Sequence, residues 1–222
     1  SRVLSMNQGP AYPAEHSWPA TISYGGVTLA PFRRRDVRTW EAVRRQNISW
    51  LRPWDATTPP GEQRGVMRTM LGQFAYEARR GEMLPWLVWF DPTGQGRGEI
   101  AGQLTVSNIK LGAARWGSIG YWVDQRWAGR GVIPAAVALA TDYCFRTMRL
   151  HRIEIHIRPE NTPSLRVVEK LGFSYEGVKP RFLHIDGDWR DHRSFALHAE
   201  EAPEGMWARL GPGIPRLDGP RS

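Results

Sequence analysis

The stretch Asp124–Ala136, DQRWAGRGVIPAA, places an arginine-containing glycine turn directly before an apolar, alanine-rich run. The turn has the form R-x-x-G-x-G. Its two glycines let the backbone curl so that several N–H groups point to one side, and the start of the following helix adds about half a positive charge. We therefore expect the turn to hold a phosphate or pyrophosphate group, helped by Arg126 and Arg130.

The spacing of this motif narrows the choice of ligand. A dinucleotide fold needs G-x-G-x-x-G, and a nucleotide P-loop ends in Lys-Ser/Thr. Neither pattern is present, so NAD and ATP are disfavoured. Taken alone, the motif is equally compatible with a plain tight turn before a helix.

A second segment, 158–177 (RPENTPSLRVVEKLGFSYEG), supplies the other half of a site. Thr162 is expected to cap a helix that has Pro163 at its first position and ends at Gly172. Asn161 then falls just outside the helix, where its amide is available to a ligand. A role as a cap or turn residue is the alternative for Asn161.

Apolar periodicity along the chain predicts a mixed α/β (α+β) domain. Helical spacing occurs at 34–47, 62–81, 132–148 and 162–173, and strand patterns at 26–32, 83–90, 99–109, 116–124, 151–159, 181–185 and 189–199. Asp186-Gly187 between the last two strands is a strong hairpin signal. This order predicts a largely antiparallel central sheet flanked by helices. The domain is expected at 24–200, with a flexible arm at 1–23 and an irregular tail at 201–222.

Composition indicates a globular protein of a reducing compartment. No apolar run approaches the ~20 residues of a membrane helix, and the first 20 residues lack the apolar core of an export signal. The single cysteine, Cys144, lies on the apolar face of a predicted helix and is expected to be a core residue and not a nucleophile. We therefore expect a cytoplasmic protein without disulfides or membrane association.

The net charge of +8 indicates an anionic ligand or a ribosomal surface as a partner. The basic residues are nearly all arginine and are scattered, apart from Arg33–Arg35. An arginine-rich RNA-binding module is one alternative. The sequence has no aromatic RNA-binding motif and no clustered basic patch, so direct nucleic-acid binding is not expected.

The two segments together resemble the GNAT acetyltransferase superfamily. Its signature, R/Q-x-x-G-x-G/A followed by N-x-x-S/A and L-G-F, corresponds here to Arg126–Gly131, Asn161–Ser164 and Leu171–Phe173. The run Ile185–His192 (IDGDWRDH) is similar to the RimJ/RimL branch, which acetylates the N-terminal amine of ribosomal proteins. The resemblance spans residues 25–200 and is strongest over 117–198.

This resemblance implies acetyl-CoA as the cosubstrate and no metal. The backbone of the strand end would pair with the pantetheine arm, the N–H groups of residues 127–132 would hold the pyrophosphate, and Asn161 would bind the pantetheine region. The implied acetyl-CoA-binding residues are Tyr121, Trp122, Val123, Arg126, Trp127, Ala128, Gly129, Arg130, Gly131, Val132, Asn161 and Ser164.

The resemblance assigns the catalytic residues less directly than the acetyl-CoA-binding residues, because Val168 stands where many GNAT enzymes carry a general-acid Tyr. Ser164 is the substitute that the RimL-like enzymes suggest; the alternative is a hydroxyl that satisfies the first helical turn. For the base, His156 occupies the strand position where some relatives hold Glu, unless it only packs there; Glu154 and Glu160 are alternatives. A protein α-amine has a pKa of ~7.7–8.0, so it needs little help from a base. Placement and backbone donors near Val123 would then supply most of the catalysis.

Aromatic and acidic residues are expected to form the acceptor groove. Its walls would be Trp50, Trp54, Tyr121, Phe182 and Trp189, and a cationic amine would be attracted by Asp186, Asp188 and Asp191. The preferred function is acetyl transfer to the N-terminal α-amine of a protein, of the ribosomal-protein alanine type. The alternatives are a small-amine acetyltransferase for an aminoglycoside, polyamine or amino acid, and a non-catalytic CoA-binding domain, which Val168 keeps open.

Overall fold

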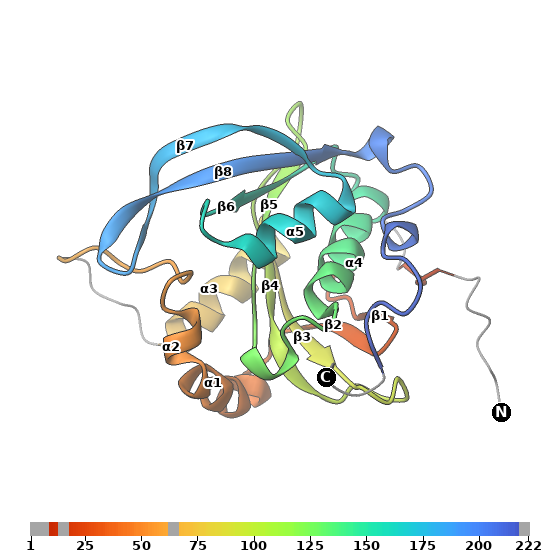
Figure 1. Ribbon diagram of the computed structural model, residues 1–222, viewed down its shortest axis with the longest axis horizontal. Helices are drawn as coiled ribbons and strands as arrows, with labels where there is room; N and C mark the ends of the chain where they lie inside the picture. Colours follow the sequence, from red (N-terminus) through yellow and green to blue (C-terminus); the bar gives the residue numbers. More distant parts are fainter. Residues whose placement is uncertain (1–8, 13–17, 62–66, 218–222) are drawn as a thin grey trace.

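A computed structural model describes residues 9–12, 18–61 and 67–217. Eight strands form one sheet in the order β1-β2-β3-β4-β5-β6-β8-β7, and each neighbouring pair is antiparallel except β5 with β6 (Figure 1). The prediction of a mixed, mostly antiparallel sheet is confirmed. The strands are β1 (Ile22–Tyr24), β2 (Val27–Pro31), β3 (Leu84–Phe90), β4 (Glu99–Lys110), β5 (Trp116–Val123), β6 (Arg152–Ile157), β7 (Ser174–Ile185) and β8 (Asp188–His198).

Helices cover both faces of this sheet. On one face lie α4 and α5, and on the other lie α1, α2 and α3 (Figure 1). The α-helices of the described part of the chain are α1 (Val37–Gln46), α2 (Ile48–Leu51), α3 (Met67–Arg79), α4 (Val132–Arg146) and α5 (Thr162–Leu171). The helix expected at 62–81 is α3; residues 62–66 of that prediction lie outside the described residues.

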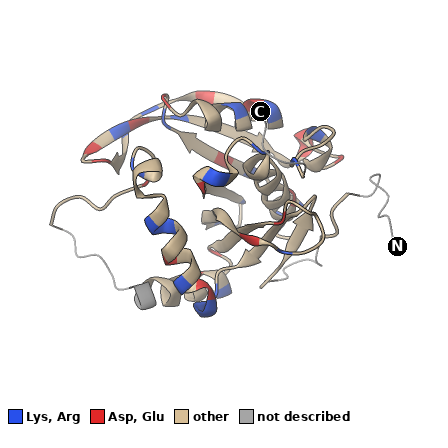
Figure 2. Ribbon diagram, turned by 60° about the horizontal axis from the view of Figure 1, so that its bottom comes forward, with Lys and Arg blue, Asp and Glu red and all other residues tan. Residues whose placement is uncertain are grey.

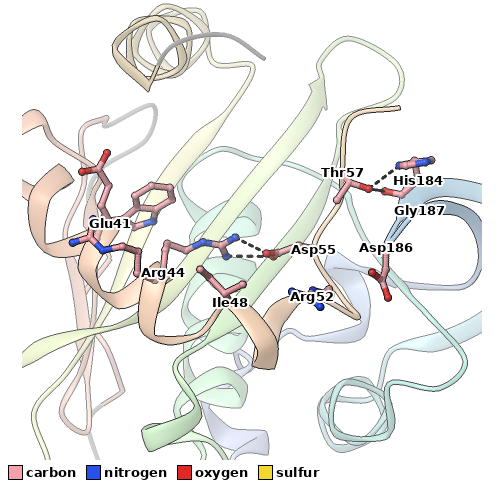
Figure 3. Close-up of a pocket in the computed structure, with 11 residues that line it drawn as sticks. Glu41, Arg44, Ile48, Arg52, Asp55, Thr57, His184, Asp186 and Gly187 are labelled. Carbon is pink, nitrogen blue, oxygen red and sulfur yellow. Dashed lines mark hydrogen bonds and ion pairs between the residues drawn. The ribbon is translucent and has the colours of Figure 1, made fainter. Parts of the chain in front are cut away.

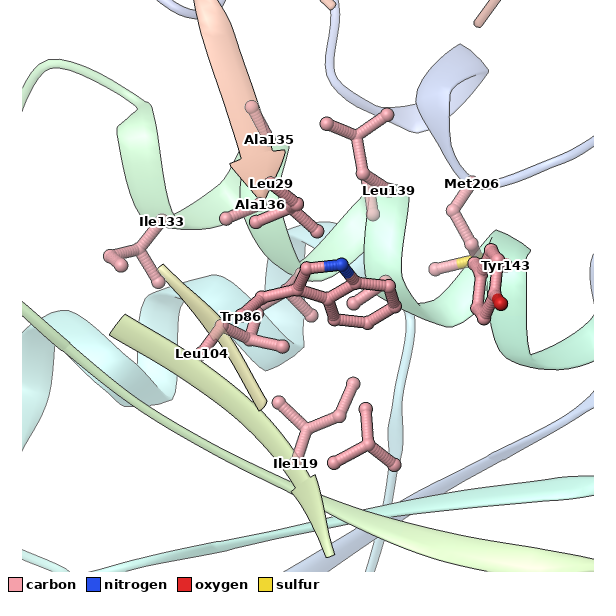
Figure 4. Close-up of a cluster of buried hydrophobic side chains, with 14 of the residues drawn as sticks. Leu29, Trp86, Leu104, Ile119, Ile133, Ala135, Ala136, Leu139, Tyr143 and Met206 are labelled. Carbon is pink, nitrogen blue, oxygen red and sulfur yellow. The ribbon is translucent and has the colours of Figure 1, made fainter. Parts of the chain in front are cut away.

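The main core lies between the sheet and α4, which is buried along nearly its whole length. Trp86 of β3 stands at its centre, with Leu104, Ile119 and Leu139 around it (Figure 4). The Trp86 ring meets Tyr143 edge to face at 5.1 Å, and its indole N–H donates to the Ala20 carbonyl at 2.9 Å. The alanines of α4 let the helix approach the sheet closely, which fixes where its N-terminus emerges at the glycine turn.

Segments at both ends of the chain pack onto this core. Within the arm predicted at 1–23, Ile22 is buried and starts β1, whereas residues 1–8 and 13–17 lie outside the described residues. The segment after residue 200 is irregular, with short 3-10 turns, but Met206 and Leu210 are buried. The Met206 amide and the Tyr12 hydroxyl both donate to the Asp142 carboxylate of α4.

Three local predictions need correction. α5 has Asn161 as its N-cap, not Thr162, because the Asn161 side chain accepts the Ser164 amide. The residues directly after 47, for which no element is predicted, form the short helix α2. β7 begins at Ser174, seven residues before the predicted strand at 181–185, and tolerates Pro180 because it is an edge strand with register shifts.

Candidate active site

The sheet opens where β5 separates from β6. Their parallel pairing covers only three positions and ends at Ser118 opposite Glu154. Beyond that point the Asp124 amide donates to the Ala101 carbonyl on β4 at 2.7 Å. Because ladder bonds alternate along an antiparallel pair, the backbone groups of Tyr121 and Val123 point away from β4 and into the gap. An extended, amide-containing chain can therefore pair with this side of β5.

The glycine turn lies at the open end of this gap and leads into α4. Its first two predicted donors are occupied, since the amides of Trp127 and Ala128 donate to Asp124 and Gln125 in a 3-10 turn. Among the described residues, the amides of Gly129 and Gly131 have no acceptor, and both glycines have left-handed backbones (φ +76° and +82°). The unoccupied amide donors of the turn are thus confined to the last residues before α4.

The two arginines of the motif are held by groups of the protein. Arg126 donates to the buried Asp124 carboxylate at 3.1 Å and lies 3.6 Å from Glu99. The Arg130 guanidinium donates to the Arg216 carbonyl at 3.0 Å and packs over Trp127. Their positive charges lie beside the turn, but both side chains are already anchored. The Trp127 ring packs edge to face against Phe90, and its indole N–H is buried with no partner among the described residues.

The start of α5 faces the gap from the other strand. The Asn161 amide oxygen is used as the helix cap, so only its NH2 group lacks a partner among the described residues. Ser164 is half-buried beside the Tyr121 phenol. Burial raises the pKa of Tyr121 to about 12, and the Ser164 hydroxyl counteracts part of that rise. Val168 is buried in the core, so no phenol reaches the gap from this helix.

His156 lies on the opposite face of the sheet, between two polar neighbours. Its Nδ1 is 2.9 Å from the Ser194 hydroxyl, and its Nε2 is 3.3 Å from a Glu154 carboxylate oxygen. Burial, followed by the charge of Lys179, lowers the pKa of His156 to about 4, so the ring is neutral at pH 7. The other predicted base, Glu160, is mostly exposed and lies 3.4 Å from Arg158.

The corner between α1 and α2 contacts the end of β5. The sequence does not predict this contact, although Trp50 is among the predicted acceptor residues. The Trp50 indole donates to the Val123 carbonyl at 2.9 Å, and the buried Asn47 accepts the Gln125 amide at 2.9 Å. Trp50 was expected only as a wall of the acceptor groove. Asn47 was not expected at all, because the sequence shows only an Asn at the end of a helix.

A cleft of about 660 Å³ lies between α1, α2 and the turn of the β7–β8 hairpin (Figure 3). Arg44 and Asp55 form an ion pair at its wall, and Arg44 also stacks over Trp122. Thr57 donates its amide to the His184 carbonyl at 2.8 Å, which ties the loop after α2 to the hairpin. Of the predicted acceptor residues, Asp186 lines this cleft.

The remaining predicted acceptor residues are dispersed. The Phe182 ring packs at a tilt against His156, with ring centroids 5.0 Å apart, and Trp54 lies under the Arg158 guanidinium. Trp189 is half-exposed and meets His184 edge to face, so it lies on the hairpin and does not line the cleft. Asp191 accepts the Arg181 amide across the hairpin. The acceptor set from the sequence is therefore not one continuous wall.

Outside this region, the charge distribution, the possible metal ligands and the helix lengths of the described residues do not point to a further ligand. Basic and acidic residues are interspersed along the ribbon (Figure 2). No group of three or more His, Cys, Asp or Glu side chains in the described ranges is placed to hold a metal. In that same part of the chain, no helix combines the length and apolarity required to cross a bilayer. Cys144 is fully buried, as predicted.

Comparisons with known proteins agree with this geometry. The chain matches the model of the acetyltransferase (GNAT) domain family over residues 27–174. The [Ribosomal protein uS5]-alanine N-acetyltransferase of Escherichia coli (strain K12) is 31% identical over 164 residues, 74% of this chain and 76% of that protein. "Probable N-acetyltransferase YjcK" of Bacillus subtilis (strain 168) is 39% identical over 98 residues, 44% of this chain and 54% of that protein.

A solved structure gives the same assignment. Mycobacterium smegmatis RimJ in complex with CoA-disulfide superposes with a TM-score of 0.79 at 40% identity and covers 87% of this chain and 94% of that chain. The region matched by the family model contains both the glycine turn and the start of α5. The chain therefore belongs to the GNAT family of acetyltransferases.

Proposed function

We propose that the chain is an acetyl-CoA-dependent N-acetyltransferase whose acceptor is the N-terminal α-amine of a protein, of the ribosomal-protein alanine type. The observation that carries the proposal is the gap between β5 and β6, where the Tyr121 backbone and the Val123 N–H face inward with no neighbouring strand and the glycine turn lies at the end. Membership of an acetyltransferase family makes the chain an enzyme, so the non-catalytic alternative is dropped. An acceptor of this kind places the enzyme in the cytoplasm.

The residues present fit acetyl-CoA, which supplies an acetyl thioester when bound. The amides of Gly129 and Gly131 at the start of α4 hold its pyrophosphate, helped by the positive end of the helix. The inward backbone of Tyr121 pairs with the pantetheine arm, and the Asn161 NH2 group donates to that arm. The Val123 N–H faces the thioester end of the arm. Arg126 and Arg130 contribute charge at a distance, since other groups already hold their side chains.

The chemistry requires little from acidic and basic side chains. The amine nitrogen forms the new C–N bond, the C–S bond breaks, and the proton lost by the amine balances the one gained by the thiolate. A neutral His156, next to Glu154, accepts the amine proton directly or through water. Its pKa of about 4 makes it a weak base, which suffices because an α-amine is already partly neutral near its pKa of ~7.7–8.0. Ser164 donates at the leaving sulfur.

The cleft between α1, α2 and the β7–β8 turn is the entrance for the acceptor. Relatives that act on ribosomal-protein alanine support a peptide in this cleft. Another relative is the L-amino acid N-acetyltransferase AaaT of Escherichia coli (strain K12), 30% identical over 95 residues, so free amino acids are the main rival acceptors.

Mass spectrometry of acetylated products separates these acceptors. Purified protein and acetyl-CoA are incubated with an octapeptide that starts with alanine, with the same peptide carrying a blocked N-terminus and one lysine, and with a panel of amino acids, polyamines and an aminoglycoside. We expect acetylation of the first peptide alone. Faster acetylation of any small amine would replace the proposal by the small-amine function, and absence of binding to acetyl-CoA would refute both.

A further inference from the structure

The corner between α1 and α2 is anchored to the end of β5 on both sides of Asp124. The Trp50 Nε1–H donates to the Val123 carbonyl, and the Gln125 amide donates to Asn47 Oδ1, each at 2.9 Å. Asn47 is 2% exposed, and its NH2 group donates to the Val43 carbonyl in the last turn of α1. These bonds join a helix corner on one face of the sheet to the strand end that borders the gap.

The Val123 carbonyl that Trp50 binds lies at the end of β5 and borders the gap between β5 and β6. In an extended strand the N–H and C=O groups of one residue point to the same side, and both groups of Val123 point into the gap. A hydrogen bond that holds the Val123 carbonyl therefore also restrains the Val123 N–H, which is joined to it through one Cα. Asp124 restrains the next peptide, because its amide bonds Ala101 and its carboxylate bonds Arg126.

We propose that Trp50 is a positioning residue for acetyl transfer: its indole N–H fixes the Val123 peptide so that the Val123 N–H polarises the thioester carbonyl. The inference rests on the proposed use of acetyl-CoA and adds a role for a side chain from the acceptor face. A preorganised donor loses strength when its direction varies, since a hydrogen bond weakens steeply as it bends.

The bond from Trp50 to Val123 also connects the proposed acceptor cleft to the place where the thioester would lie. Ile48 and Arg52, on either side of Trp50 in and next to α2, line the cleft. An acceptor that settles against this short helix therefore acts on the Val123 peptide through one indole. Trp50 is half-buried and its N–H is already engaged, so its polar group serves the strand and not the acceptor.

Carbon-13 NMR of bound [1-13C]acetyl-CoA tests this role without any acceptor. A polarised carbonyl moves downfield from its position in free acetyl-CoA. We expect this displacement in the wild type, and we expect Trp50→Phe to lose at least half of it while the Kd for acetyl-CoA stays within twofold. An isosteric benzothienylalanine at position 50, which replaces the N–H by sulfur and keeps the ring volume, should behave in the same way.

Trp89→Phe is the matched control. The Trp89 indole N–H is buried and has no partner among the described residues, so its loss should leave the carbonyl shift unchanged. With the alanine-starting octapeptide, both variants at position 50 should lower kcat about tenfold and leave the KM for the peptide within twofold.

Three results would overturn the role of Trp50: no downfield displacement in the wild type, an unchanged displacement in the isosteric variant, or a raised KM for the peptide with unchanged kcat. The last would make Trp50 a direct acceptor contact. Failure of the wild type to bind acetyl-CoA would instead refute the proposed function itself. Normal carbonyl polarisation combined with acetylation of small amines alone would change the acceptor and leave the role of Trp50 intact.

Discussion

Tyr121 is the residue whose side chain is hardest to explain by packing alone. Its hydroxyl is enclosed and has no partner in hydrogen-bond geometry among the described residues. An unsatisfied buried hydroxyl costs ~1–3 kcal/mol. The Ser164 hydroxyl lies close enough to lower its pKa, and the family's usual phenol is replaced by Val168. A polar group kept at such a cost, next to a gap in the sheet, is typical of a functional site.

Tyr121→Phe is therefore expected to leave the protein as stable as the wild type or more stable, because it removes an unpaired polar atom and keeps the ring. The free energy of unfolding, measured in urea, should rise or stay within ~0.5 kcal/mol of the wild type. In the same variant kcat should fall, since Ser164 loses its polar neighbour. A clearly lowered stability would show that the hydroxyl has a structural partner.

The pH dependence of stability reports on His156. Burial first, and Lys179 second, lower its pKa to about 4, whereas an unfolded His titrates near ~6.5. Between these values the unfolded chain binds more protons, so the free energy of unfolding falls as the pH is lowered through this window. The contribution is intact above pH ~6.5 and lost near pH ~4.

His156→Gln removes this titration and should flatten that decline, as measured by urea denaturation at pH 7, 6 and 5. Burial also lowers the pKa of His192, so part of the slope remains. A slope identical to that of the wild type would mean that His156 has the same pKa in the folded and unfolded states. In steady-state assays at pH 7, the variant should lower kcat and leave the Kd for acetyl-CoA unchanged.

Among the elements, those with strong local signals were predicted well. β4, β5, α4 and α5 begin at their predicted first residues or one residue away, because periodicity and the glycine stops act over a few neighbours. The first half of β7 was missed because Gly177 and Pro180 oppose strand structure locally. Only pairing with β8 overrides them. The N-cap is Asn161 and not the predicted Thr162, because both residue types cap helices well and the sequence alone does not distinguish them.

The turn before α4 allows a comparison of two glycines. Both Gly129 and Gly131 have left-handed backbones, where a Cβ costs roughly 1–2 kcal/mol. A Cβ on Gly131 would also lie 2.8 Å from the Ile214 side chain, whereas one on Gly129 would meet nothing within 4 Å. Gly131→Ala should therefore be less stable than Gly129→Ala and should weaken acetyl-CoA binding more.

Thermal unfolding and calorimetry on the two variants side by side check this order. Since both substitutions carry the same backbone strain, the difference between them isolates the contact with residue 214. Equal losses in the two variants would mean that the segment around Ile214 moves aside without cost.

At the scale of the whole molecule, the two ends of the described chain complete the core. Met206 and Leu210 are buried against α4, although they lie in a segment that the sequence predicts to be an irregular tail. The many glycines and prolines of this segment suggest irregular structure, so the sequence does not reveal that Met206 and Leu210 are buried. In the same way, the bonds from Trp50 to Val123 and from Gln125 to Asn47 span more than seventy residues, and local patterns carry no signal for such contacts.

Met206→Ala tests how much this C-terminal segment contributes to the free energy of unfolding. Removing a fully buried Met side chain should lower the free energy of unfolding by ~2–5 kcal/mol. Leu111→Ala, at a half-exposed position, should change it by less than ~0.5 kcal/mol. Chemical denaturation of both variants measures the contrast, and a small effect at residue 206 would show that the segment packs only loosely.

The complete burial of Cys144 has a practical consequence for enzymology. It is the only sulfhydryl in the sequence, and burial raises the pKa of its thiol well above the ordinary value. Thiolates, not thiols, attack aromatic disulfide reagents. A chromogenic assay that titrates liberated CoA can therefore run continuously in the same cuvette as the folded enzyme, with no background from the protein and no inactivation by the dye.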